Sequence, residues 1–498
     1  MKNQWLLWHV FAWIAMVGCV SPPDPTPQLS SNAKPPSLTR LPTITDIASP
    51  TSPTHIADNT RLVTHREPII APADVAGSVN PDHLLFAGAT SIDELVGFAI
   101  GNNPEIASAR ARAEAMMSRI PQARSLDDPM LTTTVFLEEI QTAAGPQELL
   151  VSLSQKFPWF GKLDARGEMA FHDAQVAYAE LANVELGVVE QVKLAYLDLY
   201  FIDQSLRVYQ DLEQRLQDVI AITRTRFETN APTVGLESVL QAEVTLEKLY
   251  ITVAELEQAR IKAAARLRKA LSLPRGTGLD IEPQLVESHL PLQMDSLLAM
   301  IEQCNPVLEA RRQAIVRDEW SIDLAQRNYY PDVNVGFNWA EIGDRGLSAA
   351  ANGRDAYSLM VGVNLPIYKR KLDAAVDEAR FRMTQSSQQY DATWNAIRAD
   401  IEKLHAAAVE HQRVLEILNT TVLQKAEQTF DLSIEAYRVD RIGFQQLIDN
   451  YEALLRFRID RHFRVTSREQ AIAQLERTLG CAVASSQPQL EPVPLPDH

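Results

Sequence analysis

The sequence predicts a mainly α-helical chain with four amphipathic β-strands, built from two copies of a strand, strand, long helix, helix unit. Three observations predict this fold class. Segments near residue 102 recur near residue 304. Stretches such as Val333–Ala340 ("VNVGFNWA") alternate apolar and polar residues, as half-buried strands do. Two stretches, from Lys162 to about Arg226 and from Lys371 to about Arg438, lack proline and favour very long helices.

Composition excludes several classes of protein. The chain has 498 residues and a formal net charge of −17, which argues against nucleic-acid binding. No 18-residue apolar run follows the extreme N-terminus, so we expect no transmembrane helix in the mature chain.

The N-terminus predicts an exported lipoprotein. Lys2 precedes an apolar segment from Trp5 to Met16, which fits a signal peptide over 1–18. The segment ends at Cys19 in a sequence that resembles a bacterial lipobox, so we expect lipidation of Cys19 and sorting to the outer membrane. An ordinary signal with a chance cysteine is the alternative. Residues 19–75 are rich in proline and serine and predict an extended tether, and 483–498 predict a disordered tail.

The two copies span 76–290 and 291–482. "NNPEIASARARAEAMM" from Asn102 matches "CNPVLEARRQAIVRDE" from Cys304, and the alternating segments that follow match as well. We expect strands at about 130–138 and 148–157 in the first copy, and at about 333–340 and 357–365 in the second. Helical hairpins follow at 162–271 and 371–480, joined by the turns "NAPTVGLES" and "VDRIGFQQ". Seven apolar residues at four- and three-residue spacing predict a coiled-coil seam in the first long helix: Val188, Val192, Ala195, Leu199, Ile202, Leu206 and Tyr209.

Strands of this length can cross a membrane, but only in a closed barrel, because a bilayer leaves edge amides without water. Four strands cannot enclose a lumen, whereas three chains would supply twelve. The lipid-facing residues would then be Val333, Val335, Phe337 and Trp339. A soluble sheet packed under helices explains the alternation equally well and stays open as the alternative.

Several motifs resemble those of the outer-membrane factor family, the TolC-like exit ducts of efflux and secretion systems. They are the two Asn-Pro helix starts, the turns "VGLES" and "IGFQQ", and the strand–helix junctions "QKFPWFGK" and "NLPIYKRK" with Pro158, Gly161 and Pro366. "FPWFGK" is similar to members that work with heavy-metal pumps. The resemblance implies a homotrimer with a twelve-stranded barrel in outer-membrane lipid and a helical tunnel in the periplasm. It also implies two partners, a periplasmic adaptor (membrane fusion protein) and an inner-membrane RND-type pump.

The resemblance assigns roles at the far end of the helices. The first turn (Val234, Gly235, Leu236, Ser238) and the second (Ile442, Gly443, Phe444) correspond to an adaptor-docking tip. We expect positive φ at both glycines and exposed anchors at Leu236 and Phe444. Asp449 and Glu452, neighbours on one helix face, correspond to a gate at which six carboxylates of a trimer bind cations. Gln446 departs from the family's serine, and plain turns on a solvated helix are the alternative.

No catalytic, cofactor or metal site is predicted. Glu402 and His405 fit the Glu-x-x-His spacing of a di-iron bundle, but the motif occurs only once. Cys304 and Cys481 either pair or remain buried thiols. We therefore expect a passive exit channel, not an enzyme, for metal cations, drugs or secreted protein. A non-porous periplasmic coiled-coil lipoprotein and a helical-bundle metalloenzyme are the alternatives.

Overall fold

The computed structural model describes residues 89–229, 231, 234–288, 293–347 and 349–483. The expected signal peptide, Cys19, the tether and nearly all of the tail lie outside the described residues. Everything described below belongs to one compact unit, which starts at Ser78.

Each half of this unit follows the order expected from the repeat. In the first half, short helices and a two-residue strand lead into a β-hairpin, and two long helices follow: β1 (Ala89–Thr90), α2 (Ile92–Asn102), α3 (Pro104–Met117), α4 (Arg119–Arg124), β2 (Met130–Thr142), β3 (Gly145–Phe157), α5 (Lys162–Glu228) and α6 (Leu236–Ala270). The second half repeats this order: β4 (Asp280–Ile281), α7 (Met294–Cys304), α8 (Pro306–Arg327), β5 (Val333–Ile342), β6 (Ala356–Val363), α9 (Lys369–Ile417), η1 (Leu418–Val422), α10 (Leu423–Arg438) and α11 (Phe444–Leu479). The predicted duplication is therefore confirmed.

In both copies, a helix that precedes the β-hairpin starts with the same cap. Asn103 and Asn305 occupy the N-cap positions of α3 and α8, and a proline follows at the first helical position. The Asn103 side chain accepts a hydrogen bond from the Glu105 amide, and Asn305 accepts one from the Leu308 amide. The first N–H groups of a helix have no partner within the helix. The asparagine side-chain oxygen accepts a hydrogen bond from one of them, and the proline has no N–H to satisfy, which is why the Asn-Pro motif fixes both boundaries.

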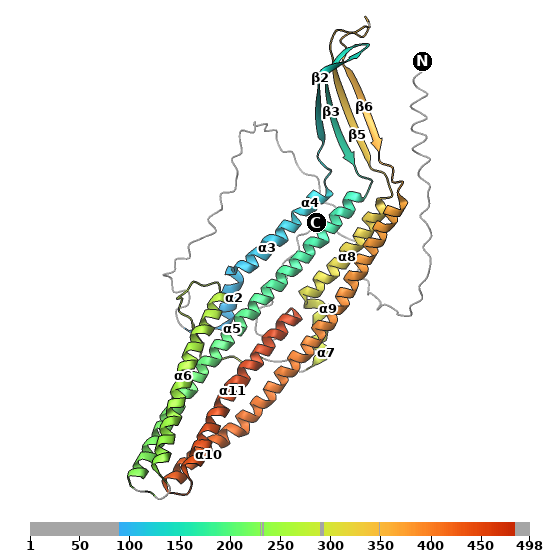
Figure 1. The fold of residues 1–498 in the computed structure, drawn as a ribbon. Helices are drawn as coiled ribbons and strands as arrows, with labels where there is room; N and C mark the ends of the chain where they lie inside the picture. The colour runs from blue at the N-terminus through green and yellow to red at the C-terminus, as the bar shows by residue number, and fades with distance from the viewer. Residues whose placement is uncertain (1–88, 230, 232–233, 289–292, 348, 484–498) are drawn as a thin grey trace, which may run out of the picture. The chain divides into compact units, whose positions relative to one another are not determined.

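The four long strands form one antiparallel sheet in the order β2-β3-β5-β6 (Figure 1). The predicted loop at 139–147 is wrong, because β2 and β3 extend through most of it and leave Ala143 and Ala144 as the turn. The extension includes a register shift between Val135 and Ile140, an irregularity that the alternation pattern cannot reveal. The last strand ends at Val363 instead of Leu365, just before the proline at 366.

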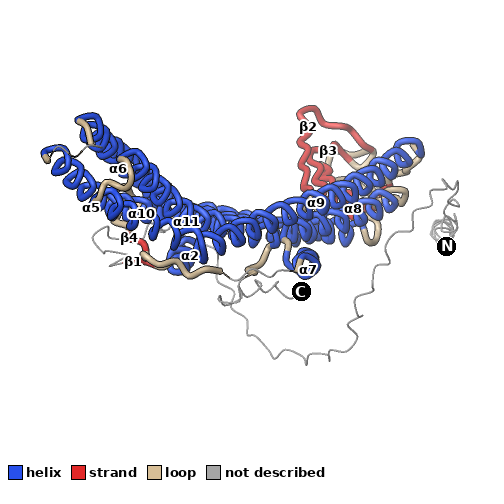
Figure 2. Tube along the Cα trace, turned by 90° about the horizontal axis from the view of Figure 1, so that it is seen from below, coloured by secondary structure: helices blue, strands red, loops and turns tan. Residues whose placement is uncertain are grey.

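The sheet lies at one end of the long helices, and the turns after α5 and α10 lie at the other end (Figures 1 and 2). The prediction of one uninterrupted helix after β6 is wrong in one detail. A π-helical turn, η1, separates α9 from α10. Within it the Thr420 hydroxyl donates to the Glu416 carbonyl at 2.7 Å, so a side chain competes for the helix's own acceptor.

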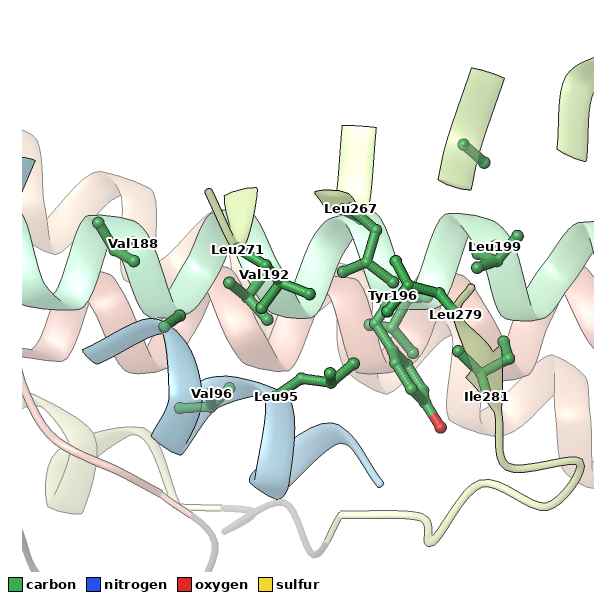
Figure 3. Packing of buried hydrophobic residues seen from close by; sticks show 14 of the residues in the cluster. Leu95, Val96, Val188, Val192, Tyr196, Leu199, Leu267, Leu271, Leu279 and Ile281 are labelled. Atoms are coloured by element: carbon green, nitrogen blue, oxygen red, sulfur yellow. The ribbon is translucent and has the colours of Figure 1, made fainter. Parts of the chain in front are cut away.

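The core is assembled around α5. Leu95 and Val96 of α2, Leu267 of α6 and Leu271, which caps the end of α6, pack with Val192 and Tyr196 (Figure 3). The predicted coiled-coil seam is buried from Val188 to Leu199, but beyond Leu199 the buried stripe shifts. It continues there through four residues that are at most 8% exposed: Val208, Leu212, Leu216 and Val219. The packing partners change at the same point, because Val208 to Val219 belong to a second cluster with Phe430 of α10 and Tyr451 of α11.

Among the helices of the described ranges, none is both long enough and apolar enough to cross a bilayer.

Candidate functional site

One face of the sheet is mainly apolar and half-buried to exposed, interrupted by polar residues such as Gln155 and Thr133. The register aligns each predicted lipid-facing residue of β5 with an apolar partner on β6, in the pairs Val333–Val363, Val335–Val361, Phe337–Leu359 and Trp339–Tyr357. The pattern continues across β3 and β2 with Phe157, Leu153, Val151, Leu131 and Val135. Phe337 is 47% exposed and Leu359 73%. An apolar patch of this extent on a single chain marks a surface that is covered by lipid or protein.

The opposite face is mainly polar. Asn334, Gly336 and Asn338 of β5 share it with Gly362, Met360 and Ser358 of β6, and with Lys156, Ser154 and Ser152 of β3. The Asn338 amide donates to the Ser358 hydroxyl at 3.2 Å. No described helix packs on either face (Figures 1 and 2), and the alternative of a sheet buried under helices therefore finds no support in this part of the chain.

The outer strands β2 and β6 each have one edge without a partner strand among the described residues. Free backbone N–H and C=O groups on such an edge pair readily with another strand. An apolar face next to two open edges is therefore the geometry of a barrel segment, which only additional strands can close.

The junction after β3 is locked by a buried ion pair. Lys162 is 3% exposed, and its ammonium donates to Asp332 Oδ1 at 2.7 Å and to the Tyr330 carbonyl at 3.0 Å. The Trp159 N–H also donates to Asp332, at 3.0 Å, and the Trp159 ring stacks on Tyr330. Burial alone would raise the pKa of Asp332, but the hydrogen bonds from Lys162 and Trp159 outweigh it and lower the pKa.

Backbone geometry explains the sequence of this junction. Pro158 is half-buried, and Gly161 caps α5 with φ +80°, a conformation that favours glycine. A Cβ at Gly161 would lie 2.1 Å from Arg327 Nη1. "FPWFGK" thus has a structural role here: it clamps the start of α5 to the start of β5.

The junction after β6 is built differently, although its sequence aligns with the first. Pro366 is half-buried, but Ile367 and Tyr368 are exposed, Tyr368 to 74%. Lys369, Arg370 and Lys371 are all exposed. The five residues from Ile367 to Lys371 line an open hollow of about 660 Å³. The lysine at the end of the motif is therefore buried in the first copy, as Lys162, and exposed in the second, as Lys371.

The expected glycine geometry of the tip turns is wrong. Gly235 and Gly443 are N-caps with φ −98° and −80°, and the residue with positive φ in the second turn is Asp440. Leu236 is 56% exposed as expected, whereas Phe444 is only 4% exposed and packs in the core with Tyr437. Phe444 therefore cannot act as an exposed anchor in this conformation. Val234 is also buried, while Ile442 and Ser238 are half-buried.

Asp449 and Glu452 are both exposed on one face of α11, six and nine residues after Gly443. Asp449 accepts a hydrogen bond from the Gln445 amide at 2.7 Å. In the described part of the chain neither carboxylate has an ion-pair partner, so both are free to meet ions or another chain.

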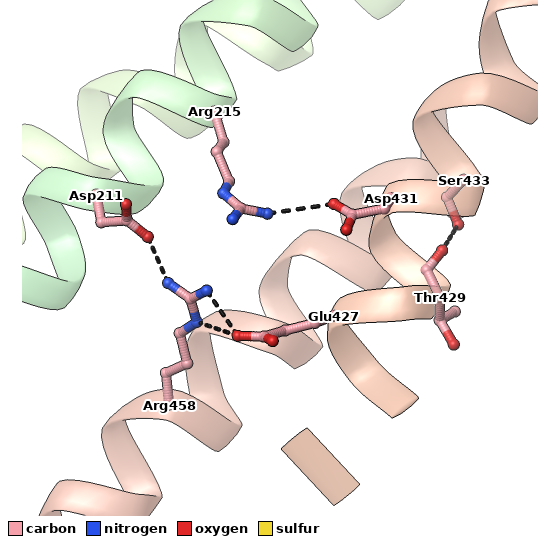
Figure 4. Close-up of polar contacts among 7 residues, drawn as sticks. All are labelled: Asp211, Arg215, Glu427, Thr429, Asp431, Ser433 and Arg458. Atoms are coloured by element: carbon pink, nitrogen blue, oxygen red, sulfur yellow. Dashed lines mark hydrogen bonds and ion pairs between the residues drawn. The ribbon is translucent and has the colours of Figure 1, made fainter. Parts of the chain in front are cut away.

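Charged pairs join the two helical hairpins near the tip (Figure 4). Arg458 of α11 bridges Asp211 of α5 and Glu427 of α10, with 2.7 Å to Glu427 Oε1. Arg215 pairs with Asp431 at 3.2 Å. The Arg458–Asp211 and Arg215–Asp431 contacts link segments more than two hundred residues apart, and periodicity within one helix gives no signal for them.

An apolar stripe along α6 is a surface that the sequence analysis missed. Leu236, Leu240, Val244 and Ile251 are all at least half exposed. Their spacing of four, four and seven places them on one side of the helix, and this signal is readable in the sequence. The stripe starts at the first tip turn and continues the exposed surface of Leu236.

The two cysteines lie in contact at the junction of α7 and α11, and the structure has them as free thiols. Burial and the neighbouring Cys304 raise the pKa of the Cys481 thiol to about 12. Glu402 pairs with Arg398 at 3.0 Å instead of with His405. Among the described residues no group of three or more His, Cys, Asp or Glu side chains is placed to hold a metal ion.

Comparisons with known proteins agree with this geometry. Residues 95–272 match the family model described as "Outer membrane efflux protein". The cobalt-zinc-cadmium resistance protein CzcC of Cupriavidus metallidurans is 22% identical over 407 residues, covering 79% of this chain and 91% of that protein. The outer-membrane channel OprN superposes with a TM-score of 0.68 at 16% identity, covering 79% of this chain and 90% of OprN. CusC superposes with a TM-score of 0.67 at 15% identity, covering 78% and 92%. The chain is therefore similar to outer membrane efflux proteins, in sequence over residues 95–272 and in fold over most of its length.

Proposed function

We propose that the chain is the outer-membrane exit channel of a tripartite efflux system. The observation that carries this proposal is the four-stranded sheet with an exposed apolar face, a polar face and two open edges. Three copies joined through these edges make a twelve-stranded barrel with lipid outside and water inside. The helices then continue the lumen into the periplasm, and the channel itself catalyses nothing.

Two partners follow from the helical end. A periplasmic adaptor docks on the tip turns and on the exposed stripe of α6, which offers the apolar face that a partner helix needs. An RND-type pump in the inner membrane supplies the energy. The double variant Leu240→Glu with Val244→Glu should abolish co-purification of the adaptor but leave the trimer intact. Glu247→Gln on the same helix is the matched control. Loss of the trimer instead would assign the stripe to contacts between copies.

The likeness to CzcC favours heavy-metal cations as cargo. Asp449 and Glu452 form the gate, because three copies place six carboxylates around one axis, where they attract cations. Replacing both by their amides should reduce the block of single channels by divalent cations. Unchanged block would remove the gate from these two residues.

The channel is tested by purification in detergent and reconstitution. We expect a trimer that conducts ions across a planar bilayer, and cobalt, zinc or cadmium sensitivity of a strain that lacks the chain. A purified monomer that leaves liposomes sealed would overturn the proposal in favour of a non-porous periplasmic lipoprotein. A conducting trimer without any metal phenotype would leave drugs or secreted protein as the cargo.

We further propose that Cys19 anchors the N-terminus to the outer membrane through lipid. The mass of the N-terminal peptide checks this, since diacylglycerol and an additional acyl chain are expected on Cys19. A Cys19→Ser variant should lose that mass. An unmodified thiol at Cys19 would contradict the anchor without affecting the channel.

A further inference from the structure

Two opposite charge clusters flank the open edges of the sheet. Asp127 and Asp128 lie just before β2, at one edge. Lys369, Arg370 and Lys371 open α9, after the five residues 364–368 that follow β6 at the other edge. All five side chains are exposed. Within the described ranges none of them forms an ion pair, although the chain forms many elsewhere. Both clusters lie at the end of the sheet that joins the helices (Figure 1).

The three cations stand where a helix by itself disfavours them. They occupy the first turn of α9, which contains no acidic residue, whereas α5 and α6 begin with Asp164 and Glu237. The N-terminus of a helix carries partial positive charge, so a cation there is disfavoured. An external anion would remove this cost.

The strand register shows which acidic residues of a neighbouring copy lie close to these cations. Continuing the β2–β3 register beyond Met130 places Asp127 level with Phe157 of β3. Phe157 pairs with Val333 of β5, and Val333 pairs with Val363 of β6, so Asp127 and Val363 lie on one line across the sheet. In a closed barrel the strands tilt by roughly 40°, and across four strands about 4.8 Å apart this staggers the register by about five residues. The next copy therefore meets Asp127 close to residue 368 or to residue 358, depending on the direction of the stagger.

The hydrogen-bond pattern fixes this direction. The Asn364 N–H donates to the Asp332 carbonyl, so the even-numbered residues of β5 bond to β6 and the odd-numbered ones to β3. Consider the sheet from outside the barrel, with β5 running away from the helices and its odd-numbered apolar residues pointing toward the viewer. The chirality of L-amino acids then places β6 to the left of β5 and β2 to the right. The right-handed twist of strands then brings Asp127 level with residues just beyond Val363 of the next copy.

We propose that Asp127 and Asp128 of one copy pair with Lys369, Arg370 and Lys371 of the next, and that these pairs set the register in which β6 joins β2. This inference rests on the proposed trimeric barrel and deepens it by naming the residues that join the copies. Edge strands slip easily when only backbone bonds hold them, and a slip by one residue would turn the apolar residues inward. Opposite charges on the two edges penalise such slips.

The test uses charge reversal in the full chain. Asp127→Lys with Asp128→Lys, and separately Lys369→Glu with Arg370→Glu and Lys371→Glu, should each raise the monomer fraction at least about tenfold at fixed protein concentration, because like charges then face each other. All five reversals together should restore the wild-type fraction. Asp377→Lys, which reverses an exposed charge on α9 away from the edges, is the control and should change nothing.

Contact is measured independently with a carbodiimide, which joins a carboxylate to an adjacent amine. In trimers mixed from ¹⁴N and ¹⁵N chains, we expect cross-links from Asp127 or Asp128 to Lys369 or Lys371 that combine both isotopes. A conducting wild-type trimer that tolerates either reversal would overturn the pairing but leave the channel standing. If only the cation variant weakens the trimer, and only in vesicles containing phosphatidylglycerol, the cations bind lipid head groups and the pairing is wrong. A wild-type chain that neither trimerises nor conducts would refute the channel itself.

Discussion

Replacing Lys162 by methionine tests whether the buried ion pair at the first junction holds the sheet to the helices. The substitution keeps the aliphatic stem but removes the ammonium from Asp332 Oδ1, 2.7 Å away, and from the Tyr330 carbonyl. Removing one partner of a buried pair costs about 3–5 kcal/mol. Lys156 stays 3.4 Å from the same carboxylate and compensates in part. We therefore expect a loss of about 3 kcal/mol in unfolding free energy, measured by denaturant titration in detergent.

Lys156→Met is the matched control, because Lys156 contacts the same carboxylate from a half-exposed position. Exposed pairs contribute about 0–1 kcal/mol, so this variant should lose little. The pKa of Asp332 is lowered in the folded chain, so the pair's stabilisation is present above the ordinary value of 3.8 and disappears as the pH falls below it. The difference between wild type and Lys162→Met should shrink there. Equal losses for the two variants would refute the reasoning.

Three further predictions concern single residues. Burial and the neighbouring Arg461 and Arg207 lower the pKa of His462 from 6.5 to about 4, so the free energy of unfolding should fall by up to about 3 kcal/mol as the pH decreases from 6.5 to 4. His462→Leu should flatten this dependence in melting experiments at different pH values. Because the pKa of Cys481 is raised to about 12, its alkylation at pH 8 should be slow in the folded chain and fast after unfolding, as mass spectrometry can follow; equal rates would contradict the buried thiol contact. Gly161→Ala should destabilise more than Gly276→Ala in denaturant titrations, since both glycines have positive φ but only at Gly161 does a Cβ collide, with Arg327.

Patterns within one element predicted most of the fold. Strict alternation located β5, and the Asn-Pro caps located the starts of α3 and α8, because strand pleat and helix capping are local physics. The π-turn at Leu418–Val422 was missed, since the side-chain bond that accompanies it resembles an ordinary threonine in a helix. The β2 extension was missed because a register shift breaks the alternation.

The candidate site was predicted in outline but not in its contacts. Phe444 follows a turn glycine, as Leu236 does, yet it is buried because Tyr437 and the second hairpin cover it. The two junction motifs align in sequence, but only the first has Asp332 facing its lysine. Both outcomes depend on residues distant in the chain, and a single sequence does not show which partners tertiary packing selects.

The length of β5 bears on the kind of bilayer the sheet suits. Ten residues at about 3.3 Å each, inclined by about 40°, rise about 25 Å along the barrel axis. This is the height of the hydrocarbon band around outer-membrane barrels, and it is less than the roughly 30 Å core of an average bilayer. In a thicker membrane the surrounding acyl chains would have to compress around the barrel, so hydrophobic mismatch favours residence in the thinner outer membrane.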